Sequence, residues 1–175
     1  MTGEDPTTTC DDRECAAPTL AHRIALEIEL RAAEAINATP RELLDGWQPL
    51  CGDDIESLED GSAMLPLPDD FLMLLRLRLA GWERDVTDVN LPGSLAAKLQ
   101  AGGCAALRGS RSRPVATMTA CASGRALRLY GRHTPPPKIE EAWYLPAPRF
   151  SDDGCINIPE ASIPILMKLV ADRLQ

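Results

Sequence analysis

The chain has 175 residues, of which 45% are hydrophobic, and its formal net charge is −8 at pH 7. This length suits one ordinary domain that buries a core without disulfides. The few aromatic residues (three Trp, two Tyr and two Phe) count against sugar-stacking clefts and single-strand nucleic-acid platforms. The negative charge disfavours a free-standing nucleic-acid binder. Because no apolar run approaches roughly 18 residues and the start is polar, we expect neither a membrane contact nor a secretion signal.

Six cysteines are scattered along the chain, and without an export signal we expect them to be reduced thiols. Cys10 and Cys15 lie close together and, with His22 or His133, are an alternative zinc set. Structural zinc sites usually have a second short cysteine pair, which is missing here. We therefore expect no metal and no cofactor.

Residues 1–19 are acidic and have little to bury, so they predict a flexible N-terminal arm. A helix is expected from Thr19, a candidate N-cap, to about Asn37. Its predicted apolar stripe consists of Leu20, Ala21, Ile24, Ala25, Ile28, Ala32 and Ala35. Thr39 then offers a cap for a short helix over 41–45, and residues 51–63 form an acidic loop.

The middle of the chain changes to an alternating pattern. Prolines at 66 and 68 predict an extended stretch and a turn before a strand over 71–79. One face of that strand would hold Phe71, Met73, Leu75, Leu77 and Leu79, with Arg76 and Arg78 opposite. A second strand is expected over 82–89, and Ser94 would cap a short helix over 95–101.

The last third predicts a β-hairpin, a strand and a helix. Residues 114–122 and 125–130 flank the turn signal Ser123-Gly124. A strand is expected over 140–145, after a stiff run of three prolines, and a helix over 163–174. The fold class is therefore α+β: N-terminal helices, a central antiparallel β region with hairpins and a C-terminal helix, in a single domain over 20–175.

Charge is distributed in blocks. Residues 1–88 carry seven basic and twenty acidic side chains, whereas residues 89–139 carry eight basic side chains and no acid. Such blocks suit a head-to-tail contact between copies, internal neutralisation within one monomer, or contact with phosphate. In the first case, the acids of 53–60 in a neighbouring copy would be partners. The candidate interface residues are Arg108, Arg111, Arg113, Arg125, Arg128 and Arg132.

Motifs for catalysis are missing from the sequence. It contains no P-loop, no HExxH and no GxSxG pattern. The paired acids at 11–12, 53–54, 69–70 and 152–153 lie in turn-like sequence, where aspartate commonly bonds the backbone. His22 and His133 have no nucleophile near them in the sequence. We therefore expect no catalytic residues and no enzyme.

Two segments resemble a known family. Residues 67–74 read LPDDFLML and residues 77–84 read LRLAGWER. Together they resemble the pattern LPxDFLRLxxxRLxGWxR of virion and prophage proteins of gut Bacteroidales. Those proteins are in turn similar to head–tail adaptors of tailed phages, of the tail tubular protein A kind. The order of elements over 20–175 is also similar, including the WYLP run at 143–146.

The resemblance implies a structural virion protein that forms a ring, commonly a dodecamer, between the portal and the tail. Its partners would be further copies, the portal protein and tail proteins, with DNA passing through non-specifically. The protein would be present in the host cytoplasm during assembly and then in the neck of the virion. The arm and the three prolines have no counterpart in the family pattern. The alternative is a small regulatory or binding domain that contacts nucleic acid or an acidic protein through its Arg-rich segment 108–132.

Overall fold

The computed structural model describes residues 20–51, 55–102, 105–133 and 135–172, with backbone only at residues 20–23 and 105. The predicted arm 1–19 and the cap Thr19 lie outside these ranges, as do the cysteines at 10 and 15. The fold is α+β, as expected. Its elements are α1 (Leu20–Ala38), η1 (Arg41–Leu43), β1 (Gln48–Pro49), β2 (Glu56–Ser57), β3 (Ala63–Pro66), β4 (Phe71–Leu79), β5 (Val89–Asn90), α2 (Leu95–Ala101), η2 (Ala105–Leu107), β6 (Val115–Cys121), β7 (Gly124–Tyr130), β8 (Ile139–Pro146), η3 (Glu160–Ser162) and α3 (Ile163–Ala171).

Two sheets form the β part of the molecule. One has the order β1-β8-β4 and the other the order β2-β3-β7-β6-β5. All pairs are antiparallel, as predicted, except the short parallel pair of β5 with β6. Side chains from both sheets share one apolar core. The predicted hairpin is present, although Cys121 pairs with Gly124, so its turn lies one residue earlier than expected.

Strand β4 has the predicted bounds, but not the predicted faces. Its pairing with β8 shifts between Phe71 and Met73 and again between Leu74 and Arg76. Each shift inserts a residue into the strand, so the side chains facing the main core recur at intervals of three. Phe71, Leu74 and Leu77 therefore face the main core, whereas Leu75 lies in a second cluster. The expectation that Met73 and Leu75 share the face of Phe71 was wrong.

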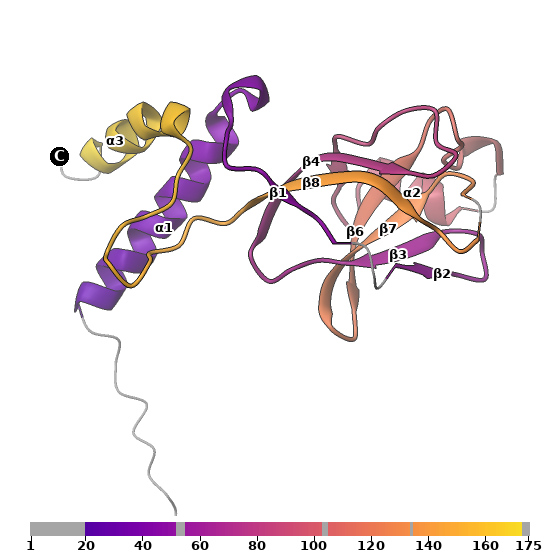
Figure 1. Ribbon diagram of the computed structural model, residues 1–175, viewed down its shortest axis with the longest axis horizontal. Helices are drawn as coiled ribbons and strands as arrows, with labels where there is room; N and C mark the ends of the chain where they lie inside the picture. Colours follow the sequence, from indigo (N-terminus) through magenta and orange to yellow (C-terminus); the bar gives the residue numbers. More distant parts are fainter. Residues whose placement is uncertain (1–19, 52–54, 103–104, 134, 173–175) are drawn as a thin grey trace, which may run out of the picture.

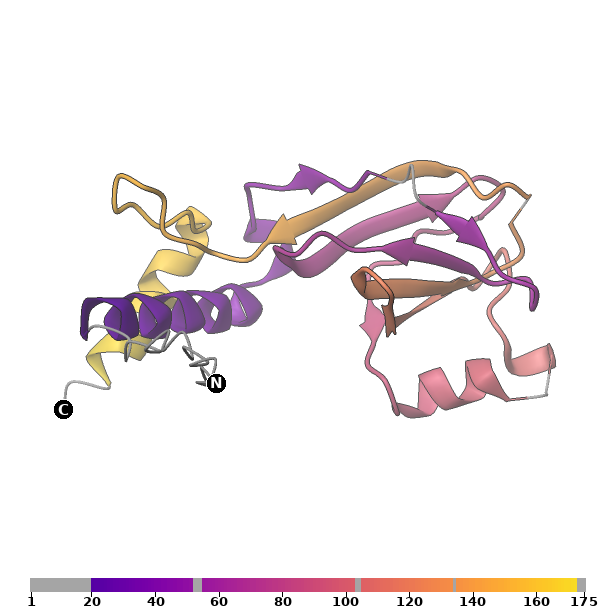
Figure 2. The same ribbon diagram turned by 90° about the horizontal axis from the view of Figure 1, so that it is seen from below.

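Helices α1 and α3 pack together at one end of the elongated molecule, and the β part lies at the other (Figures 1 and 2). A small cluster joins the two parts: Ile36 from α1, Leu44, Leu75 from β4 and Leu145 from β8. Ala32 and Ala35 are buried as predicted. Ile24, however, is 51% exposed, because it lies farther along α1 from this cluster. None of the helices in the described residues is both long and apolar enough to cross a membrane.

Two further predictions are corrected. Residues 82–88 do not form a strand, and Val89 begins the short β5. Val86 makes one isolated bridge to Leu77, and Trp82 is buried with its Nε1 donating to the Gly131 carbonyl. Separate contacts of this kind, with the ion pairs of Asp85, hold the segment instead of a continuous hydrogen-bonded ladder. The expected helix over 41–45 is the single 3-10 turn η1, because Thr39 does not cap it. The Thr39 hydroxyl instead bonds the Ala35 carbonyl and the Ser162 hydroxyl between α1 and η3.

The expected short helix and the last elements are confirmed. Helix α2 has the predicted bounds, and the Ser94 hydroxyl accepts a hydrogen bond from the Ala97 amide at 3.2 Å. Strand β8 covers the expected residues and extends one further at each end. Helix α3 begins at Ile163 as predicted and ends at Ala171, whereas the last residues of the expected helix, 173–174, lie outside the described ranges.

Candidate interface site

A groove with a volume of about 650 Å³ lies between α2 and the segment that leads into β6. Helix α2, which forms one wall of the groove, lies at the end of the molecule that is far from α1 and α3 (Figures 1 and 2). Four of the six candidate interface residues line the groove, and we call it the arginine groove. These residues are Arg108, Arg111, Arg113 and Arg132.

Gln100 positions the wall of the groove. This side chain, at the end of α2, is buried. Its Oε1 accepts a hydrogen bond from the Gly109 amide at 2.7 Å, and its Nε2 donates to the Leu107 carbonyl at 3.3 Å. One side chain therefore holds both sides of the peptide that contains Arg108. Because a buried amide left without partners is costly, Gln100 ties the segment to the helix.

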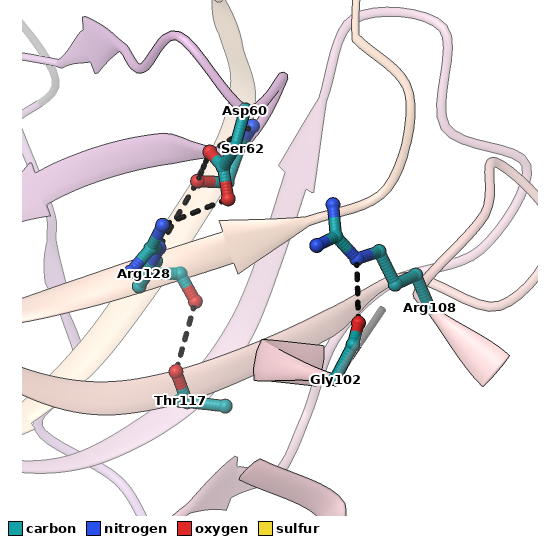
Figure 3. A network of polar contacts seen from close by, with 6 residues as sticks. All are labelled: Asp60, Ser62, Gly102, Arg108, Thr117 and Arg128. Atoms are coloured by element: carbon teal, nitrogen blue, oxygen red, sulfur yellow. Dashed lines mark hydrogen bonds and ion pairs between the residues drawn. The ribbon is translucent and has the colours of Figure 1, made fainter. Parts of the chain in front are cut away.

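A tight turn carries two of the arginines. Ser110 and Arg113 exchange two backbone hydrogen bonds of 3.1 Å, and the Ser110 hydroxyl accepts another from the Arg113 amide. Arg111 lies at the tip of this turn, where its Nε donates to the Arg132 carbonyl at 3.4 Å. The Arg108 side chain is held by a separate contact, because its Nε donates to the Gly102 carbonyl at 3.3 Å (Figure 3). Backbone carbonyls thus fix the orientation of the Arg108 and Arg111 guanidinium groups.

The groove carries a net positive charge, because four arginines and Glu83 line it. None of its four guanidinium groups forms an ion pair with a carboxylate of the described residues. Glu83 contributes the acidic side chain to the lining, and Ala96, Leu99, Leu107 and Val115 add apolar surface. Four like charges around one hollow repel each other, and an anionic partner relieves that repulsion. The arrangement therefore suits a ligand that is both acidic and partly apolar.

The other two candidate residues are used within the chain. Arg125 Nη2 donates to the carbonyls of Asp69 and Phe71 at 3.1 and 2.9 Å, which holds the turn before β4. Arg128 pairs with Asp60 at 2.8 Å (Figure 3). Its guanidinium lies 5.5 Å from the ring centroid of Tyr130. The charge of Arg128 is therefore neutralised within its own chain by the carboxylate of Asp60.

Replacing Asp60 by Asn is expected to weaken the dependence of stability on acid pH. The pKa of Asp60 is lowered from its ordinary value of 3.8, mainly by the Ser62 hydroxyl at 2.5 Å and also by Arg128. A depressed folded-state pKa contributes stability above the unfolded value, and this is lost as the pH falls through the folded value. Urea unfolding near neutral pH and at about pH 3 measures it. An unchanged difference between the two pH values in Asp60→Asn would contradict the assignment.

In each pair of acids in the described residues, one carboxylate accepts hydrogen bonds within the chain. The Tyr144 hydroxyl donates to Asp70 at 3.1 Å, and burial, together with this carboxylate, raises the pKa of Tyr144. Asp153 accepts from the Ser151 hydroxyl and the Cys155 amide in a turn, and the Ser151 contact lowers the pKa of Asp153. The pairs at 11–12 and 53–54 lie outside the described ranges.

Neither histidine forms part of a described metal cluster. The pKa of His133 is lowered by burial, and its Nδ1 is buried without a hydrogen-bond partner. Within 20–51, 55–102, 105–133 and 135–172, no three His, Cys, Asp or Glu side chains gather in a way that could hold a metal ion. The side chain of His22 and both N-terminal cysteines are outside that description.

Comparison with known proteins adds no assignment, because neither protein-family models nor curated proteins match the chain. The site was partly visible in the sequence, since the acid-free block contains all four groove arginines. Gln100 and Gly109, which shape the groove, were not predicted. A glutamine at the end of a short helix and one glycine among several carry no periodic signal that would have singled them out.

Proposed function

We propose that this protein is a structural assembly protein, an oligomeric head–tail adaptor of a tailed phage or prophage. In this role copies join one another around the DNA channel, between portal and tail, without catalysis. The observation that carries the proposal is the arginine groove, whose four guanidinium groups lack carboxylate partners among the described residues of their own chain.

The distribution of charge over the fold supports contacts between unlike surfaces. The helical end, made of residues 20–47 and 147–172, contains five basic and nine acidic side chains, a net of −4. Helix α2, which lines the arginine groove, lies at the opposite end of the molecule (Figure 1). When a basic surface of one copy meets an acidic surface of the next, the contact is heterologous, and it produces a ring wherever the rotation closes.

The segment that resembles the adaptor family supplies a large part of the main core of the β part. Residues 67–84 contain the proline turn, all of β4 and the buried Trp82. Phe71 stacks on Tyr144 of β8, with ring centroids 5.8 Å apart. These residues hold the fold together, and this role accounts for the segment that resembles the family pattern. The proposed contacts between copies are made by other surfaces.

Native mass spectrometry tests the proposal. The purified protein is measured alone and after mixing with a portal protein, where one is encoded nearby. We expect a discrete high-order ring in at least one sample, whose mass gives the number of copies. A monomer under both conditions would contradict self-assembly.

The groove also supports a second candidate, a small binding domain for nucleic acid. Unpaired guanidinium groups bind phosphate as readily as carboxylate. If four arginines each replaced a counterion, the logarithm of the binding constant for duplex DNA would fall with the logarithm of salt concentration with a slope of roughly −4. Salt-dependent DNA binding without any ring would favour this candidate.

A further inference from the structure

The arginine groove and the N-terminal residues have complementary charge. Residues 1–19 contain five acidic side chains and one arginine, a side-chain net of −4. We propose that the groove of one copy binds residues 1–19 of another copy. This inference rests on the proposed function, because it names the contact through which the copies join.

The lining of the groove favours an acidic peptide as its occupant. Leu99 is 36% exposed and Leu107 is 53% exposed, and both lie among the arginines. Residues 1–19 place acids at 4–5, 11–12 and 14 among threonine, proline, cysteine and alanine. A phosphate backbone would leave the leucines uncovered, whereas this sequence offers both carboxylates and small apolar side chains.

The position of α1 favours another copy over the same chain. Helix α1 begins at Leu20, at its end away from the β part, whereas the groove lies at the far end of the molecule (Figures 1 and 2). A fully extended segment of this length reaches at most about 65 Å. Passing back along α1 and β4 alone would use about 28 Å and about 30 Å. Binding within the same chain would thus require a nearly straight arm, at a large cost in entropy.

One of the acids first considered as partners is already engaged. Within the expected segment 53–60, Asp60 binds Arg128 and Ser62 of its own chain. Breaking that pair in order to form another gains little free energy. Residues 1–19, with five acids, therefore offer more carboxylates than the four that remain in 53–60.

Complementation between two full-length variants tests the proposal. The arm variant neutralises the five N-terminal acids, and the groove variant reverses two arginines. We expect each variant alone to remain monomeric where the wild type assembles. Mixed together they should form a heterodimer and nothing larger, because one intact groove meets one intact arm. The substitutions are Glu4→Gln, Asp5→Asn, Asp11→Asn, Asp12→Asn and Glu14→Gln in the arm variant, and Arg111→Glu and Arg113→Glu in the groove variant.

A matched control and a peptide measurement complete the experiment. Lys138→Glu with Arg149→Glu makes the same change in charge outside the groove, at two exposed residues, and should assemble as the wild type does. A labelled synthetic peptide of residues 1–19 should bind the arm variant by fluorescence anisotropy under reducing conditions. Adding the two arginine reversals should weaken this binding by about tenfold or more.

The possible results separate this inference from the proposed function. An arm variant that still forms rings would overturn the inference and leave self-assembly standing. A wild type that is monomeric alone and with the portal protein, while the peptide binds, would overturn both self-assembly and binding to another copy, because the groove would then serve its own chain. Binding of duplex DNA but not of the peptide would overturn the inference in favour of a nucleic-acid site.

Discussion

Replacing Gly109 by alanine is expected to lower the free energy of unfolding by about 3 kcal/mol. A Cβ at this position would lie 2.4 Å from the Tyr130 carbonyl oxygen and 2.8 Å from its carbonyl carbon. Both atoms belong to the backbone of β7, so a side chain cannot rotate away to make room. Either the strand or the groove wall must move, and the second movement breaks the hydrogen bond from Gly109 to Gln100.

Urea unfolding of Gly109→Ala against the wild type measures the loss. Gly102→Ala is the matched control, because Gly102 has φ −68° and a Cβ added there would lie 3.5 Å from its nearest neighbours, two backbone carbonyl oxygens. We expect the control to change the free energy of unfolding by less than about 0.5 kcal/mol. Equal effects of the two substitutions would show that the close approach of Gly109 to β7 is not what holds the segment.

Replacing Leu77 by alanine should cost about 3–5 kcal/mol of stability. Leu77 has no exposed surface and lies at the centre of the main core. Its backbone pairs with Ala142 of β8 and also bridges Val86. Because β8 holds it on one side and the bridge to Val86 holds it on the other, the structure has little freedom to collapse into the space that the side chain leaves. The full cost of the cavity is therefore expected.

Leu91→Ala provides the comparison for Leu77→Ala. It removes the same atoms from a side chain that is 67% exposed, so its cost should stay below about 0.5 kcal/mol. Chemical denaturation of both variants measures the two losses of stability. A loss below about 1 kcal/mol for Leu77→Ala would mean that the bulged strand does not place this leucine in the core as described.

Helix ends and turns were predictable because their causes are local. Ser94 caps α2 through a hydrogen bond to a residue three positions on, and no distant part of the chain is needed for it. The hairpin of β6 and β7 likewise follows from a short turn between two alternating runs. The failures had distant causes: the Thr39 hydroxyl bonds Ser162, which lies 123 residues away, instead of capping η1.

The faces of β4 show why register escapes sequence reasoning. Apolar residues recur at every second position from 71 to 79, as in a regular strand, but two bulges set by pairing with β8 shift which side chains point inward. A shift of one residue moves every following side chain to the opposite face. The partner strand determines where the shift occurs. The sequence therefore predicts that the apolar residues of this strand are buried, but not which of them lie in the same cluster.

The α+β class, the order of the main elements and the acid-free block that supplies the groove's charge follow from the residues alone. How the six arginines are used depends instead on which segments folding brings together. Arg125 and Arg128 lie on a strand whose neighbours offer carbonyls and Asp60, whereas the other four lie on connecting segments that Gln100 and Gly109 hold around one hollow. The physical reason is that charge is a property of each residue, whereas its partner depends on which distant segment folding places beside it.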